Sequence, residues 1–105
     1  MRLLTKDLRR RLPRLAATDG QGMNALARVH FFVPGSGWDW YATEFDGRDL
    51  FFGLVRGHVI ELGYFSLREL DSVRTSWGLR VERDLHWQPR TLREIEVLLE
   101  AQGHG

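Results

Sequence analysis

Four acidic side chains near the middle of this 105-residue chain have types and spacing suited to acid–base or metal chemistry. Carboxylates that meet at one point can hold a hard cation or act as an acid–base pair. Asp46 and Asp49 flank a predicted turn, and Glu44 and Glu61 lie on the strands around it, which would gather all four at one end of a sheet. The competing interpretation makes the aspartates turn formers and the glutamates ordinary exposed strand residues. We favour the second, and keep a carboxylate-based metal-dependent enzyme as an alternative.

The sequence lacks the residues that other kinds of catalysis need. The chain has no cysteine, which excludes thiolate catalysis, and its four histidines are not spaced to share one helical turn, as a zinc site on a helix requires. It contains no GxSxG, GxxxxGK[ST] or GxGxxG sequence. We therefore assign no catalytic residue and no metal ligand, and we expect no cofactor.

Basic side chains are concentrated at the start of the chain. Residues 1–37 hold seven basic and two acidic side chains, and residues 38–64 hold two basic and five acidic ones, although the whole chain sums to only +1. Arginine makes forked hydrogen bonds to phosphate, and exposed aromatic side chains on a sheet can stack on unpaired bases. The first alternative function is therefore a single-stranded DNA-associated accessory protein. Its candidate contacts are Arg9, Arg10, Arg11 and Arg14.

Aromatic residues gather in one third of the chain, with ten of the twelve in residues 31–65. Tryptophan, tyrosine and arginine supply most of the energy of protein–protein interfaces, so aromatic side chains left exposed would form a candidate interface. In so small a protein most of them must instead fill the core. The aromatic residues concerned are Trp38, Trp40, Tyr41 and Trp77.

Hydrophobic spacing and turn residues predict the elements of the first two thirds of the chain. Leucines at helical spacing predict a helix over residues 4–15, ended or kinked by Pro13, and the glycine-rich residues 16–25 predict a mobile linker. Residues 28–65 predict four strands, which must be antiparallel because their connections are too short for parallel crossovers. On the second of these strands, residues 38–45, alternation places Trp38, Trp40, Ala42 and Glu44 on one face and Asp39, Tyr41, Thr43 and Phe45 on the other.

Two capping boxes, Ser66 with Glu69 and Thr91 with Glu94, predict the later helices. An alternating segment between them predicts an edge strand. The two helices are expected over residues 66–76 and 91–101, and the strand over residues 80–87. Together the elements predict a single α+β domain, residues 1–105, in which helices pack on one face of an antiparallel four- to five-stranded meander sheet.

Membrane association is not expected from the sequence. No apolar run approaches the ~20 residues that span a bilayer, and no secretory signal opens the chain. The cytoplasm is the expected compartment.

Three segments, WDWYATE (38–44), DGRDLFFGLV (46–55) and ELGYFSLREL (61–70), resemble a family of small bacterial proteins of unknown function, found largely on plasmids, integrative elements and prophages. The likeness spans nearly the whole chain. It implies a mobile-element accessory protein, a class that often binds and blocks host defence machinery, and it transfers no catalytic residue. The positions of this pattern that are not obviously core are Thr43, Glu44, Asp49, Glu61 and Tyr64.

We accordingly expect a non-enzymatic accessory protein that binds and inhibits a host protein complex, such as an anti-CRISPR or anti-restriction inhibitor. Contact with nucleic acid through the basic N-terminal helix remains the alternative. The candidate binding residues are Trp40, Tyr41, Thr43, Glu44, Asp49, Glu61 and Tyr64.

Overall fold

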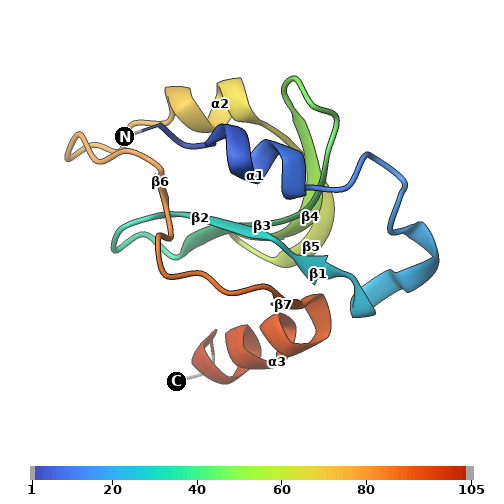
Figure 1. The fold of residues 1–105 in the computed structure, drawn as a ribbon. Helices are drawn as coiled ribbons and strands as arrows, with labels where there is room; N and C mark the ends of the chain where they lie inside the picture. Colours follow the sequence, from blue (N-terminus) through green and yellow to red (C-terminus); the bar gives the residue numbers. More distant parts are fainter. Residues whose placement is uncertain (1, 104–105) are drawn as a thin grey trace.

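A five-stranded antiparallel sheet forms the centre of the computed structural model, which describes residues 2–103 (Figure 1). Four consecutive strands make a meander, and a short later strand joins its edge, giving the order β5-β4-β3-β2-β6. These strands are β2 (Val29–Val33), β3 (Trp38–Phe45), β4 (Leu50–Arg56), β5 (Ile60–Ser66) and β6 (Glu82–Arg83). A second, two-stranded sheet pairs β1 (Leu26–Ala27) with β7 (Arg90–Thr91). The predicted α+β class and antiparallel sheet are confirmed.

The helices cover both faces of the sheet, rather than the single face expected from the sequence (Figure 1). The helices α1 (Lys6–Arg11) and α2 (Leu67–Ser72) lie over the face whose core includes Phe31 and Phe51. The helix α3 (Leu92–Gly103) packs Ile95 and Leu99 against the opposite face. The strands carry apolar side chains on both faces, so each face needs its own cover.

The N-terminal helix is shorter than predicted. The Thr5 hydroxyl caps the amide of Leu8 at 3.1 Å, and the helix ends at Arg11, two residues before Pro13. The prediction of a helix over residues 4–15 is therefore wrong at both ends, although Leu4, Leu8 and Leu12 do reach the core. The glycine-rich residues 16–25 are not a linker without structure, because they contain the 3₁₀ helix η1 (Asp19–Asn24).

One of the two predicted capping boxes has both of its hydrogen bonds, and the other has one. Thr91 and Glu94 bond reciprocally, with the Glu94 amide 3.1 Å from the Thr91 hydroxyl and the Thr91 amide 3.2 Å from the Glu94 carboxylate. Ser66 accepts from the amide of Glu69 at 3.2 Å. The helix that follows ends at Ser72, short of the predicted residue 76, whereas α3 runs to residue 103.

The strand predicted over residues 80–87 shrinks to Glu82 and Arg83. Asp84 ends it by forming a turn, since its carboxylate accepts from the amide of His86 at 3.0 Å and its carbonyl from the amide of Trp87 at 3.3 Å. Such local side-chain-to-backbone bonds compete with strand pairing. The alternation of apolar and polar residues over 80–87 is present in the sequence, but it does not lead to a strand of that length.

A β-bulge in β3 changes which side chains share a face. The pairing with β4 shifts between Ala42 and Glu44, and an extra residue in one strand reverses the alternation beyond it. Phe45 thus joins the core that contains Trp40 and Ala42, contrary to the predicted faces. The bulged residue Thr43 is fully buried and donates its hydroxyl to the Phe52 carbonyl at 3.1 Å.

Among residues 2–103, no helix has the length and apolar character needed to cross a bilayer.

Candidate functional site

The four carboxylates proposed as a cluster do not come together. Asp46 accepts from three amides of its own turn, and Asp49 bonds the Ser66 hydroxyl and the Arg68 amide at the start of α2. Glu61 is exposed and pairs opposite Val55, far along β5 from the end of β3 that holds Glu44. Within the described part of the chain, no three potential ligands meet. The four carboxylates therefore form no cluster; the turn-former interpretation is confirmed for Asp46, whereas the Asp49 side chain bonds the start of α2 instead of its own turn.

Glu44 is not the ordinary exposed strand residue that we favoured, because only 2% of it is accessible. Its two oxygens accept from the amides of Ala16 and Thr18, each at 2.8 Å, and from the Thr18 hydroxyl. Burial would raise the pKa of Glu44, but these hydrogen bonds outweigh it and hold the pKa below its ordinary value. Glu44 therefore fastens residues 16–18 to the sheet.

Replacing Glu44 by glutamine tests this role. Glu44→Gln puts an amide donor where an oxygen now accepts, so we expect a loss of about 2 kcal/mol of folding free energy at neutral pH. The lowered pKa means that the wild-type carboxylate contributes stability above the unfolded pKa and loses it as the pH falls. The difference between variant and wild type should therefore shrink in acid. Urea unfolding across a pH series measures it, with exposed Glu61→Gln as the control; an equal loss in both variants would contradict the role.

Three further candidate residues are buried. Trp40 and Tyr41 are 8% and 6% accessible, and Thr43 is fully enclosed. A side chain already packed in the core has little surface left to offer a partner. Of the seven predicted binding residues, Glu61 and Tyr64 are exposed and Asp49 is half-buried.

A polar network missed by the sequence reasoning lies around His30. Its Nε2 is 2.7 Å from an Asp39 oxygen and its Nδ1 is 3.0 Å from an Asp84 oxygen, while Arg56 donates to the second oxygen of Asp39. The ring of Tyr41 stacks on the imidazole at 4.4 Å, nearly parallel. Both nitrogens of His30 are occupied, so neither is free to act on a substrate as a general base. The network joins β2, β3, β4 and the segment after β6.

The electrostatics of this network follow from burial. Burial would raise the pKa of Asp39, yet the bonds from His30 and Arg56 hold it below its ordinary value. Burial, aided by the charge of Asp39, raises the pKa of Tyr41 above its ordinary value. One signal was present in the sequence: His30, Asp39 and Tyr41 fall on one face of the predicted hairpin. Asp84, from a distant segment, gave no local signal.

The basic cluster of the N-terminal helix is divided by the fold. Arg10 and Arg11 pair with Asp7 on their own helix, at 3.1 and 3.0 Å. Arg9 turns the other way, bonding the Gly47 carbonyl at 3.2 Å and lying over the Phe45 ring. Arg14 is exposed beyond the helix. The four arginines therefore do not form one continuous row, and binding of single-stranded DNA by them stays a prediction.

The most exposed aromatic side chain is on the loop between α2 and β6, residues 73–81. Trp77 is 89% accessible, and its neighbour Leu79 is 41% accessible. Thr75 closes the loop around it: its amide and carbonyl pair with Leu79 and Gly78, and its hydroxyl accepts from the amides of Trp77 and Leu79. Gly78 takes a φ of +78°, which favours glycine. The loop is thus a closed turn that displays an indole ring.

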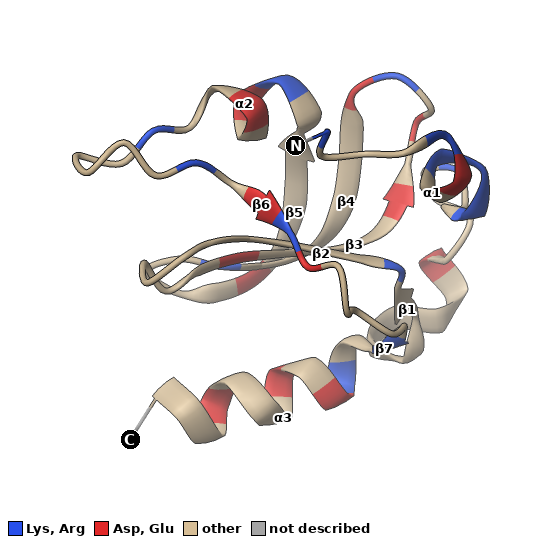
Figure 2. Ribbon diagram, turned by 60° about the vertical axis from the view of Figure 1, so that its left-hand side comes forward, with Lys and Arg blue, Asp and Glu red and all other residues tan. Residues whose placement is uncertain are grey.

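The surroundings of Trp77 are basic. Figure 2 shows the loop projecting from the body of the molecule with a basic segment on each side of its tip. These segments are Arg74 and Arg80, both exposed, and residues 74–80 contain no carboxylate. The sequence singled out Trp77 only among other aromatic residues, and burial distinguishes it. We define residues 74–80 as the Trp77 loop.

Comparison with known proteins identifies a family but no function. A family described as "Protein of unknown function (DUF2958)" matches residues 3–102. No curated protein and no solved structure matches the chain significantly.

Proposed function

Because the chain belongs to the DUF2958 family, whose description assigns no activity, we propose from its geometry that it is a non-enzymatic binding module. It docks on a host protein complex through the Trp77 loop. The observation that carries this proposal is the display of Trp77, 89% accessible, on a turn closed by Thr75.

An exposed indole on an ordered turn is well suited to protein recognition. A tryptophan buries about 150–250 Å² when it enters a pocket, and tryptophan is among the commonest residues at the energetic centre of interfaces. The hydrogen bonds of Thr75 hold the turn in place before binding, so less conformational entropy is lost on docking. The same indole makes little contact with its own chain, so it contributes little to folding.

The charge of the Trp77 loop indicates what kind of surface the partner presents. Arg74 and Arg80 flank the indole; Arg80 lies 3.5 Å from Asp71, and Arg74 has no carboxylate within 4.0 Å among residues 2–103, which favours a partner surface that carries negative charge beside an apolar pocket. The proposal includes the mobile-element setting suggested by the family resemblance. There, occupation of a functional surface would inhibit a host defence complex without any catalytic step.

Alanine at position 77 separates binding from folding. Trp77→Ala is expected to leave the unfolding midpoint unchanged, because the indole is exposed, and to abolish retention of the partner. The wild-type protein, immobilised, is used to capture complexes from a lysate of a bacterium that carries the gene. Val97→Ala, 61% accessible on α3, is the matched control. A protein that wild type and Val97→Ala both retain, and Trp77→Ala loses, is the expected result; equal retention by all three contradicts the proposal.

A further inference from the structure

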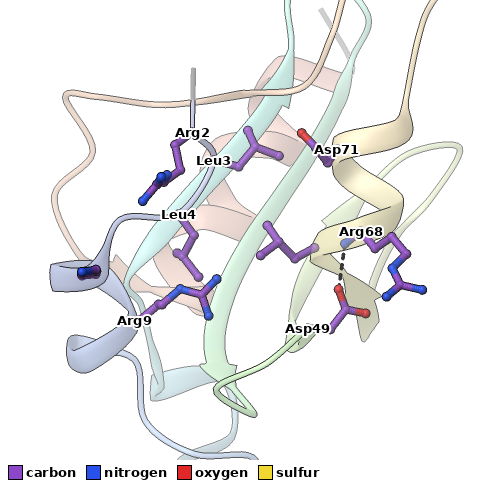
Figure 3. A pocket seen from close by; sticks show the side chains of 9 residues that line it. Arg2, Leu3, Leu4, Arg9, Asp49, Arg68 and Asp71 are labelled. Carbon is purple, nitrogen blue, oxygen red and sulfur yellow. Dashed lines mark hydrogen bonds between the residues drawn. The ribbon is translucent and has the colours of Figure 1, made fainter.

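A cleft lies between α1 and α2, on the face of the sheet opposite α3 (Figure 3). Its volume is about 510 Å³, within the range of small-molecule sites. Its lining residues are Arg2, Leu3, Leu4, Lys6, Arg9, Asp49, Leu67, Arg68 and Asp71. No residue of the Trp77 loop contributes to it.

The cations of this cleft are unpaired, whereas those on the other side of the same helix are paired. Among residues 2–103, neither Arg2, Lys6 nor Arg9 has a carboxylate oxygen within 4.0 Å. Arg10 and Arg11, which do not line the cleft, both pair with Asp7. With Arg68, which also lines the cleft and has no carboxylate oxygen of the described residues within 4.0 Å, these cations outnumber the two lining carboxylates, Asp49 and Asp71, by two, and the excess positive potential is relieved by an anion.

The two carboxylates that line the cleft already have partners on the α2 side. The Asp49 oxygens accept from the Ser66 hydroxyl at 2.7 Å and from the Arg68 amide at 2.8 Å, the bond drawn in Figure 3. Asp71 lies 3.5 Å from Arg80. Asp49 is thus engaged by the start of α2 and Asp71 by Arg80 of the loop that follows α2, whereas the α1 side of the cleft carries only cations.

The walls of the cleft are held in place by contacts outside it. Arg83 of β6 donates to the carbonyls of Arg2 and Leu3 at 2.6 and 3.0 Å, which fixes the N-terminal segment. Arg9 is oriented by the Gly47 carbonyl and the Phe45 ring, and Figure 3 shows its guanidinium reaching from α1 toward α2. A site whose donors are already positioned loses less entropy on binding.

We propose that this cleft binds a phosphate monoester with an apolar body. Leu3 and Leu4, 6% and 2% accessible, form the floor of the cleft, and half-buried Leu67 with the aliphatic stems of the cationic side chains supplies apolar surface against which the organic part of such an ester packs. Arg2, Lys6 and Arg9 supply donors for the three terminal oxygens of a phosphate that carries nearly two negative charges at neutral pH. The combination of an apolar lining with a three-cation rim distinguishes this ligand from inorganic phosphate, which offers no apolar surface.

Titration calorimetry with phenyl phosphate and with inorganic phosphate tests the proposal. We expect phenyl phosphate to bind more tightly than inorganic phosphate. Lys6→Gln and Arg9→Gln should each weaken its binding about tenfold, the size expected for loss of one charge-assisted hydrogen bond. Arg10→Gln and Arg11→Gln remove the same charge from the same helix outside the cleft, so they are the matched controls and should bind as wild type does. The Lys6 side chain makes no hydrogen bond within residues 2–103, so its substitution keeps the test valid if Arg9→Gln unfolds.

Three results would overturn the proposal. The first is no binding of phenyl phosphate at millimolar concentrations, and the second is equal weakening by all four substitutions. The third is binding of a thymidine oligonucleotide alone, weakened equally by all four, which would indicate a general polyanion surface. None of these three results would contradict the function proposed for the Trp77 loop, because the residues of that loop do not line the cleft.

Discussion

Alanine at position 53 is expected to destabilise the protein by about 3 kcal/mol or more, a large part of the folding free energy of a domain this size. A Cβ at Gly53 would lie 1.8 Å from the Tyr41 carbonyl oxygen and 2.8 Å from its carbon. These are backbone atoms of the neighbouring strand, so no side chain can rotate away to make room. Relief requires β3 and β4 to separate beside the bulge at Thr43, where the pairing is already irregular.

Gly63 supplies a matched control for this prediction. It pairs with Gly53 from the adjacent strand β5, and a Cβ built on it meets no atom within 4 Å. Gly63→Ala should therefore change stability by less than about 1 kcal/mol. Urea unfolding followed by tryptophan fluorescence measures both variants. Similar midpoints for Gly53→Ala and Gly63→Ala would show that the close approach of β3 to β4 is not a constraint.

Removal of the Asp39 carboxylate is expected to cost about 3–5 kcal/mol, the range for breaking a buried ion pair by deleting one partner. Asp39→Ala leaves Arg56 and one nitrogen of His30 without an acceptor, in a site where Asp39 is only 7% accessible. The loss should be largest at neutral pH. The pKa of Asp39 is lowered by folding, so its contribution is present above the unfolded pKa and fades as the pH falls.

Asp7→Ala is the control for charge and residue type. Asp7 also pairs with arginines, but its side chain and those of Arg10 and Arg11 are more than half exposed. Solvent screens such pairs, and we expect a change below about 1 kcal/mol. Chemical unfolding of both variants at several pH values measures the loss of folding free energy in each. An Asp39→Ala loss no greater than that of Asp7→Ala would mean that the His30 network adds nothing to the fold.

The meander and the helix starts were predictable because their signals are local. Short connections dictate antiparallel neighbours, and a capping box such as Thr91 with Glu94 needs only four consecutive residues. The helix ends were less predictable: α2 stops at Ser72 although no proline or glycine marks that position. Covering of both faces was also missed, because alternation tells which side chains share a face and not which face a later helix covers.

The candidate site was largely misplaced for two physical reasons. The bulge at Thr43 is a register shift between strands, which the sequence of one strand does not reveal. Glu44 has its partners in residues 16–18, which belong to the segment 16–25 that the sequence predicted as a mobile linker. An acidic residue in a strand is usually solvated, so only the tertiary contact could show that this one is enclosed. Glu61 and Tyr64, which the family pattern marked as positions not obviously in the core, do lie exposed on β5.

The late strand β6 has a consequence for synthesis on the ribosome. The meander is complete once Ser66 has been made, but the outer edge of β2 waits for Glu82 and Arg83, and His30 waits for Asp84. During that interval the nascent sheet has two unpaired edges, a state that invites pairing with other chains. Once the last quarter of the chain has left the ribosome, β6 pairs with β2, and β5 remains an outer strand at the other end of the sheet. A stop codon before residue 82 would make the open-edged form permanent.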